Sequence, residues 1–398
     1  MAVYLSIVMF LSLIVSYTDM VKIKKIFFIV VISALSILAM LYDPIKGYLD
    51  YGMYTDTYRM FKELDMFRYY GWNADKILQG TPNMTTNYES IIVAKAYMYF
   101  CAMVTKNNHI LPLINSVLTY GSIALGLSMI GKKIKADSVM IVSSFVTFIL
   151  INDYYITVTN IRLPLAMALF ILIWSRQIVS NKRSIWQYIF YVLMCLLHSA
   201  MFIFLAIKLI VDFTSKKLKN FFIVVMLASS LFLNQLISLL QRFASVGAFV
   251  SGLLQKVVFY SDSNGYVGVA ALKANYRFVI FDLIRISYFL FLIYVLSRAS
   301  QKNKDFIKSN SGITSLITFG ELLVAFAIGA LWSYHLFHRT VLFMVMIIPV
   351  YLVIIAKYYN VRILPLKRLN VFSIITWIFV LINVIYYFFG FSYNQLVI

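Results

Sequence analysis

The sequence predicts an all-α, polytopic integral membrane protein with about 11 to 12 transmembrane or membrane-dipping helices and long outer loops. Of its 398 residues, 62% are hydrophobic and only 13% are charged. The mean hydropathy is +0.86. These values exclude a soluble globular domain. The second indication is that apolar runs close to membrane length recur along the whole chain, and the third is that short basic breaks separate many of them.

The apolar runs give the expected helices in order. A helix needs about 20 residues to cross a bilayer, so the shorter runs are expected to tilt or to extend into their flanks. No separate soluble domain is visible, and a single membrane domain over 1–398 is predicted. The runs fall at 3–17, 26–42, 90–105, 111–130, 138–151, 161–179, 185–211, 221–240, 277–297, 313–333, 340–356 and 371–390.

The formal charge of +20 reflects membrane topology and not a nucleic-acid partner. More than half of the 35 Lys and Arg residues lie in six short breaks between apolar runs. Short basic loops of this kind mark the cytoplasmic side of a protein whose partner is the lipid bilayer. The breaks are 18–25, 131–137, 180–184, 214–220, 298–308 and 357–370.

This topology places two long polar stretches, 43–89 and 241–276, on the outer side. If every basic break is cytoplasmic, an even number of membrane crossings must separate neighbouring breaks. The apolar runs give an odd number in two intervals, the one that contains 43–89 and the one that contains 185–211. In 43–89 a re-entrant or interfacial element can resolve the count. For 185–211 two interpretations are open: a hairpin with its tip near His198, or one long tilted helix.

Several ionisable side chains fall inside or at the ends of the apolar runs. Such groups are costly in lipid, and by default they mark a functional cavity. Several of these cations lie close to the outer loops, which suggests a site for an anion at the membrane surface. The residues are Arg162, His198, Arg277, Arg285, Glu321 and Arg339.

Arg162 lies where the run 161–179 begins. Asn160 can cap a helix there, and Pro164 suits a first helical turn. A helix N-terminus presents free N–H groups to anions, and the planar guanidinium matches phosphate oxygens. The alternative is an arginine that extends its charge to the lipid headgroups.

The other ionisable residues also leave alternatives. His198 is either a general base or phosphate donor, or a partner in an interhelical hydrogen bond. Asp282 and Arg285 have the i,i+3 spacing of an internal pair, which would leave Arg277 free for a ligand. Glu321 can pair with one of the arginines. His335 and His338 lack a third ligand, so no metal site is predicted.

The stretch 43–89 carries nearly half of the 15 acidic residues and many aromatic ones. Carboxylates bind hydroxyls and aromatic faces pack on sugar rings, but the same composition suits an aromatic belt at the membrane interface. No Walker loop, GxGxxG, GxSxG or HExxH motif occurs. No cofactor is therefore predicted, and activated groups are expected to arrive on the substrate.

Several short motifs, in order, resemble those of the Wzy-type polysaccharide polymerases, particularly their EpsG-like branch. The stretch 50–58 resembles the family's Asp-Tyr-x-x-Tyr-x-x-x-aromatic element, and Glu89 follows as the acidic residue before the next span. The stretch 160–166 resembles its Asn-x-x-Arg-Gln-x-x-Ala helix opening, with Leu163 where the family often has Gln. His198 and a late arginine, Arg339, come at suitable distances.

The resemblance implies an enzyme that joins undecaprenyl-pyrophosphate-linked oligosaccharide repeat units at the outer face of the bacterial cytoplasmic membrane. The partners of such an enzyme would be the lipid-linked donor and acceptor. The resemblance also allows a chain-length regulator as a further partner. The alternatives are a flippase or exporter of such lipids and a glycan ligase. The implied sites are pyrophosphate binding by Arg162, Arg277, Arg339 and Arg285, proton acceptance by Glu89, His198 or Asp50, and glycan contact by Tyr51, Tyr54 and Tyr58.

Overall fold

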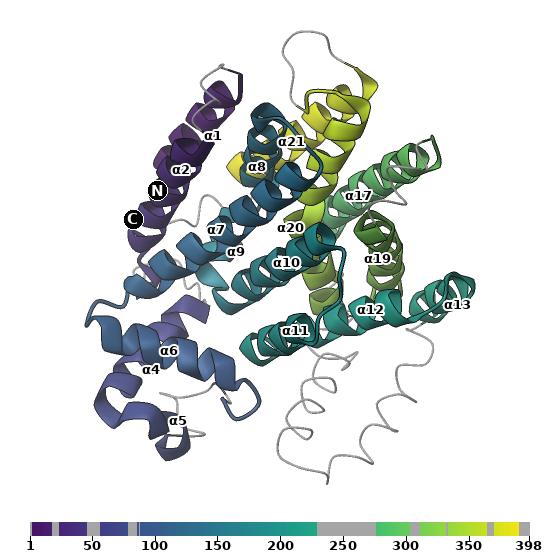
Figure 1. Cartoon of the computed structure of the whole chain (residues 1–398). Helices are drawn as coiled ribbons and strands as arrows, with labels where there is room; N and C mark the ends of the chain where they lie inside the picture. The colour runs from purple at the N-terminus through teal and green to yellow at the C-terminus, as the bar shows by residue number, and fades with distance from the viewer. Residues whose placement is uncertain are drawn as a thin grey trace. The chain divides into compact units, whose positions relative to one another are not determined.

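The computed structural model of the chain describes residues 2–17, 24–45, 56–78, 86, 88–228, 276–302, 311–331, 333–363 and 370–389. All regular structure in these ranges is helical (Figure 1). The chain divides into two compact units. Unit 1 comprises Met1–Ser180, Ser184–His198 and Leu352–Ile398, and unit 2 comprises Asn181–Arg183 and Ser199–Tyr351. Each unit is described by itself below.

The prediction of an all-α, multi-pass membrane protein is confirmed. Five described helices are long and apolar enough to cross a membrane, and shorter apolar helices accompany them. The long ones are Ile110–Lys133, Arg162–Ser180, Tyr276–Lys302, Gly312–Gly329 and Tyr334–Tyr359. The shorter ones are Val3–Ile14, Ile92–Val104, Ser138–Ile151, Ile185–Leu197, Leu218–Leu227 and Val371–Tyr387.

Unit 1 is built around α7, which lies between α2 and α10 (Figure 1). Gly126 on α7 faces Ser175 on α10, and an added Cβ would lie 2.8 Å from the Ser175 Oγ. A small residue at such a contact lets two membrane helices approach closely. The helices of unit 1 are α1 (Ala2–Tyr17), α2 (Lys24–Met40), α4 (Asp56–Tyr70), η2 (Gly71–Asn73), α5 (Ala74–Ile77), α6 (Ile92–Val104), α7 (Ile110–Lys133), α8 (Ser138–Ile151), α9 (Tyr154–Thr159), α10 (Arg162–Ser180), α11 (Ile185–Leu197) and α21 (Val371–Phe389).

Tyrosine hydroxyls on two helices of unit 1 bond to backbone carbonyls of neighbouring helices. The Tyr154 hydroxyl donates to the Leu35 carbonyl within α2 at 2.6 Å, and the Tyr387 hydroxyl donates to the Ile151 carbonyl at the end of α8 at 2.8 Å. Both rings are buried. The bond to Ile151 satisfies a helix-end carbonyl that would otherwise lack a partner within its helix.

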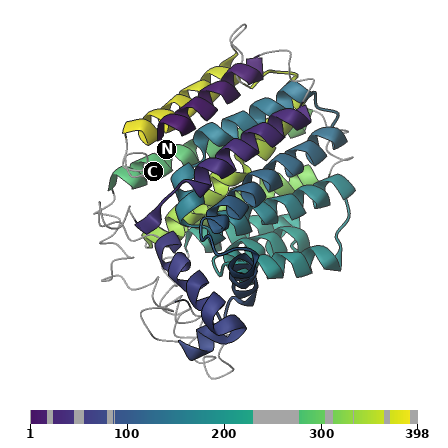
Figure 2. The same ribbon diagram turned by 90° about the vertical axis from the view of Figure 1, so that its left-hand side faces the viewer.

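The helix α6 lies across the others in unit 1 and not along them. Figure 1 shows it lengthwise below α7, and Figure 2 shows it end-on while α7 and α10 are seen along their length. It has 13 residues, so at 1.5 Å per residue it is roughly 20 Å long, shorter than a membrane core. The helix α4 packs on it, and α5 is joined to it by the ion pair between Asp75 and Lys95. The described part of the stretch 43–89 therefore contributes a helical layer to unit 1.

Unit 2 contains α12 (Met201–Phe213), α13 (Lys216–Leu227), α17 (Tyr276–Lys302), α19 (Ser311–Gly329) and most of α20 (Tyr334–Tyr359). Phe204 stacks on Phe343 with ring centroids 4.3 Å apart. The Tyr351 hydroxyl donates to the Leu316 carbonyl at 2.6 Å, which ties α20 to α19. Glu321 pairs with Lys219 on α13, so the predicted pairing with an arginine is wrong for this residue.

The run 185–211 is two helices, because the chain leaves helical geometry at His198 (φ −150°, ψ 119°). The interpretation as one continuous tilted helix is therefore wrong. The break falls at the tip expected for a hairpin, and the direction of the second arm stays a prediction. The predicted outer stretch 241–276, except for Tyr276, lies outside the described residues, as do Asp50, Tyr51 and Tyr54.

Candidate active site

The junction between α9 and α10 shapes the start of the Arg162 helix. The short helix α9, which the hydrophobic pattern does not reveal, is capped by the Asp153 side chain on the Ile156 N–H. Asn160 then ends α9 and accepts the Leu163 N–H on its carbonyl oxygen at 3.2 Å. The predicted helix opening at Arg162 is confirmed. Its first-turn N–H groups have no carbonyl partners within the helix.

Arg162 is buried, and the described residues offer it no counter-charge. Its side chain is only 8% exposed, and its Nε has no hydrogen-bond partner. Within the described part of the chain it forms no ion pair. An uncompensated charge away from water costs several kcal/mol. Burial with no ion pair among the described residues is typical of a side chain that binds an anionic ligand.

The helix α4 is attached next to this junction. The Thr57 hydroxyl lies 2.9 Å from the Val158 carbonyl and 3.0 Å from the Thr159 carbonyl, at the end of α9. The hydroxyl donates one proton, which these two acceptors share. Tyr58 follows on α4, with the Lys62 ammonium 4.7 Å from its ring centroid. The end of the Asp-Tyr motif is thereby bonded to a carbonyl three residues before the start of the Arg162 helix.

A buried carboxylate joins α4 to the segment before α6. Glu63 is fully buried and accepts the Tyr88 hydroxyl at 2.6 Å and the Thr86 N–H at 3.2 Å. The Arg59 Nε lies 3.8 Å from the same carboxylate. These partners compensate the buried negative charge. Glu89, the predicted acidic residue, comes directly after Tyr88 and is exposed.

The electrostatics of Tyr88 link this carboxylate to Arg162. Burial, followed by the neighbouring Glu63 carboxylate, raises the pKa of the Tyr88 hydroxyl well above its ordinary value. The positive charge of Arg162 acts on the same hydroxyl in the opposite direction. Arg162 is therefore close enough to Tyr88 to be felt electrostatically. Unit 1 brings Tyr58, the segment of Glu89 and Arg162 into one neighbourhood.

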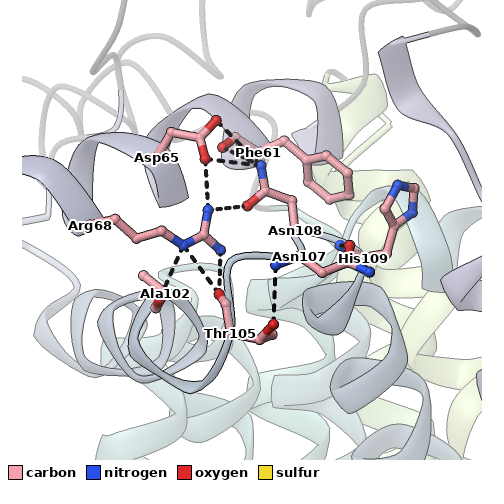
Figure 3. Close-up of polar contacts among 8 residues, drawn as sticks. All are labelled: Phe61, Asp65, Arg68, Ala102, Thr105, Asn107, Asn108 and His109. Carbon is pink, nitrogen blue, oxygen red and sulfur yellow. Dashed lines mark hydrogen bonds and ion pairs between the residues drawn. The ribbon is translucent and has the colours of Figure 1, made fainter.

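The other end of α4 is fastened by Arg68 (Figure 3). Its guanidinium donates to the carbonyls of Ala102 and Thr105 at the end of α6, at 3.1 and 2.9 Å. It also reaches Asp65 at 2.6 Å and Asn108 at 2.5 Å. A cation at a helix C-terminus satisfies free carbonyls and the helix dipole. These contacts hold α4 against α6.

A second buried pair holds α5 to α6. The Lys95 ammonium lies 2.7 Å from the Asp75 carboxylate and 4.5 Å from the centroid of the Trp72 ring. Both members of the pair are nearly fully buried. Removal of one partner would leave the other charge uncompensated. The helical layer of α4 and α5 is thus held to α6 by polar contacts at both ends.

The predicted cations of unit 2 have different surroundings. Arg277 is exposed and donates to the hydroxyl of its neighbour Tyr276 at 3.1 Å. Arg285 is 2% exposed and lies 3.3 Å from Asp282, which confirms the predicted internal pair. Arg339 is half-buried at the start of α20.

The chain matches the EpsG family over residues 24–397. It belongs to that family. No curated protein sequence and no solved structure matches the chain. EpsG membership supports a function of the polysaccharide-polymerase type, and the apolar helices identify this member as a multi-pass membrane protein.

Two features of this EpsG family member escaped the sequence reasoning. Glu63 was one of many outer carboxylates, although a helical pattern over 56–70 places it beside the apolar residues Met60, Leu64 and Phe67. The contact between Asp282 and His338 joins residues 56 positions apart, and no local pattern shows it.

His198 is half-buried at the helix break.

Proposed function

We propose that the chain joins undecaprenyl-pyrophosphate-linked oligosaccharide repeat units at the outer face of the bacterial cytoplasmic membrane. The observation that carries this proposal is Arg162, a buried and uncompensated cation at the N-terminus of a 19-residue helix. The family membership supplies the reaction class, and Arg162 supplies a position for the diphosphate.

The proposed reaction develops negative charge on a group that a buried arginine can bind and stabilise. When the growing chain leaves its lipid carrier, negative charge develops on the departing pyrophosphate. A guanidinium fork and free helix N–H groups, already oriented before the reaction, stabilise that charge at little reorganisation cost. Because Arg162 has no competing carboxylate among the described residues, its full charge is available to the ligand.

The remaining assignments are extensions of this proposal. Arg277, Arg339 and Arg285 stay predictions for diphosphate binding, and Arg285 lies 3.3 Å from Asp282. Glu89, His198 and Asp50 stay predictions for the proton acceptor. Tyr58, with Tyr51 and Tyr54, stays a prediction for glycan contact.

Reconstitution tests the proposal directly. The full chain in lipid nanodiscs would receive undecaprenyl-pyrophosphate-linked repeat units extracted from a strain that lacks it, without nucleotide or metal. We expect a ladder of polymer lengths on a gel and release of undecaprenyl pyrophosphate. Unchanged repeat units would contradict the proposal.

The deletion strain separates the competing functions. Loss of a polymerase leaves single repeat units outside the membrane. Loss of a flippase leaves none outside, and loss of a ligase leaves long chains on the carrier lipid. Either of the last two phenotypes would overturn the proposed polymerisation.

A further inference from the structure

Unit 1 contains a cluster of buried polar atoms that have no hydrogen-bond partner among the described residues. Three of them lie on α7: the Oδ1 of Asn115, the Oγ of Ser116 and the Oγ1 of Thr119. Their side chains are fully buried. The fourth atom is the Nε of Arg162. Because a buried polar atom without a partner costs free energy, such a cluster indicates that something outside the chain supplies the missing partners.

Two contacts place the α7 residues beside Arg162. The Asn115 amide nitrogen donates to the carbonyl of Thr157 in α9, just ahead of α10, at 2.9 Å. Further along both helices, Gly126 of α7 faces Ser175 of α10. The helices α7 and α10 therefore run side by side in the same direction (Figure 1). Arg162, the first residue of α10, is level with the first half of α7.

The α7 groups share one face of the helix and are not used within it. Asn115 and Thr119 have i,i+4 spacing, and Ser116 and Thr119 have i,i+3 spacing, so the three side chains are neighbours. A buried hydroxyl in a helix commonly donates to the carbonyl one turn earlier, as Thr147 on α8 does to Ser143 at 2.8 Å. The hydroxyls of Ser116 and Thr119 make no such bond. They retain their full capacity to bind a ligand.

The hydrogen-bonding character of these atoms defines the chemistry of the ligand. The Oδ1 of Asn115 only accepts, so the ligand must carry a donor such as a hydroxyl. The Nε of Arg162 only donates and carries positive charge, so the ligand must also carry an anionic acceptor. An ionised diphosphate alone has acceptors but no donor. A sugar joined directly to a diphosphate carries both kinds of group next to each other.

We propose that Asn115, Ser116 and Thr119 bind hydroxyl groups of the sugar that is joined directly to the diphosphate, while Arg162 binds the diphosphate. This inference rests on the proposed polymerisation and adds a sugar subsite to its diphosphate site. The contacts hold the anomeric carbon in a fixed orientation to its leaving group, which favours the transfer. Because the side chains are fully buried, the ligand reaches them when the helices around the junction open locally.

The test compares two lipids that differ only in this sugar. One is undecaprenyl pyrophosphate, and the other is the same lipid carrying only the first sugar of the repeat unit, from a strain blocked after the first sugar transfer. Each is titrated into nanodiscs that contain the full chain, and a gel verifies that the sugar-bearing lipid stays unpolymerised. Ser116→Ala and Thr119→Val should each weaken binding of the sugar-bearing lipid by about 5- to 10-fold. Binding of undecaprenyl pyrophosphate should change by less than about twofold.

The matched controls are Ser144→Ala and Thr147→Val on α8. They remove equally buried hydroxyls that already have partners in their own helix, and both variants should bind the two lipids like wild type. Thermal unfolding adds a second measurement. Thr119→Val should not lower the unfolding temperature of the ligand-free protein, because its hydroxyl has no partner to lose among the described residues.

The outcomes separate this inference from the proposed function. If Ser116→Ala and Thr119→Val bind the sugar-bearing lipid like wild type, the inference is overturned while polymerisation stands. Equal weakening for both lipids, or a loss of affinity that follows a loss of thermal stability, would overturn it as well. Arg162→Gln should weaken both lipids by at least about tenfold. If Arg162→Gln binds undecaprenyl pyrophosphate like wild type, the diphosphate site of the proposed function is wrong, and the inference with it.

Discussion

Two buried arginines, one in each unit, differ in whether their charge is compensated. Arg162 is 8% exposed and has no ion pair among the described residues, whereas Arg285 is 2% exposed and lies 3.3 Å from Asp282. In the sequence both are cations in apolar helices, but only Arg285 has an acidic residue at helical spacing, Asp282. The difference shows that burial alone does not identify a ligand-binding arginine. Burial without a counter-charge among the described residues is the feature that identifies it.

The energetics follow from this contrast. A buried charge without a partner raises the free energy of the folded state by several kcal/mol, and an anionic ligand can remove that cost. Arg285 already has its anion in Asp282, so a second one would find little net charge there. Arg162 retains the full benefit for a bound diphosphate.

The largest expected effect comes from Arg162→Lys. An ammonium cannot replace a bidentate guanidinium fork, so polymer formation should fall by roughly 100- to 1,000-fold. Gel analysis of the reconstituted reaction measures it. Arg298→Lys, an exposed arginine on α17, is the matched control and should retain the wild-type rate. Normal polymer from Arg162→Lys at equal expression would remove this arginine from the site.

The comparison becomes sharper when both arginines are replaced by methionine. Arg285→Met removes the arginine that pairs with the buried Asp282 and should destabilise the protein by about 3 kcal/mol. Arg162→Met removes an uncompensated charge and should stabilise the ligand-free protein by about 1 to 2 kcal/mol. Thermal unfolding of the lipid-free, detergent-solubilised variants gives both values. If both variants shift the unfolding temperature in the same direction, the distinction between the two arginines is wrong.

The anchoring of the outer layer gives a smaller effect. Tyr88→Phe removes the hydroxyl that Glu63 accepts at 2.6 Å, and it should lower stability by about 1 to 2 kcal/mol. Activity should fall with it, because the layer that carries Glu89 loosens near Arg162. Tyr69→Phe changes an exposed tyrosine on α4, the helix that carries Glu63, and is the control. Equal unfolding temperatures for Tyr88→Phe and Tyr69→Phe would contradict the anchoring role.

The smallest expected effect is that of Thr57→Val. It removes the bond from α4 to the end of α9 and should cost about 1 kcal/mol. Thr340→Val is the control, because the Thr340 hydroxyl bonds only to the Leu336 carbonyl of its own helix among the described contacts. Protease cleavage within α4 should accelerate for Thr57→Val and not for Thr340→Val. The opposite order would show that α4 is held by other contacts.

Much of the fold could be predicted because lipid imposes a simple rule on sequence. Apolar runs with basic breaks predicted the helices, and the start of α10 at Arg162 followed from the residues around Pro164. The i,i+3 spacing of Asp282 and Arg285 likewise predicted a local pair. These features depend on neighbours within a few turns, which the sequence displays directly.

The missed features depend on contacts between distant segments. The pairing of Lys219 with Glu321 joins two helices that no local pattern connects. The burial of Glu63 depends on Tyr88, which lies 25 residues later. The break at His198 was foreseen as one of two interpretations, because an apolar run of that length suits both a single helix and two short ones. Only the folded chain distinguishes them.

Binding of undecaprenyl pyrophosphate tests the central claim most directly. Titration of the ligand into nanodiscs that contain wild-type protein, Arg162→Gln or Arg298→Gln gives three dissociation constants. The buried, uncompensated Arg162 predicts that Arg162→Gln weakens binding by at least about tenfold, or roughly 1.4 kcal/mol, while Arg298→Gln binds like wild type. Equal affinities for wild type and Arg162→Gln would contradict the account.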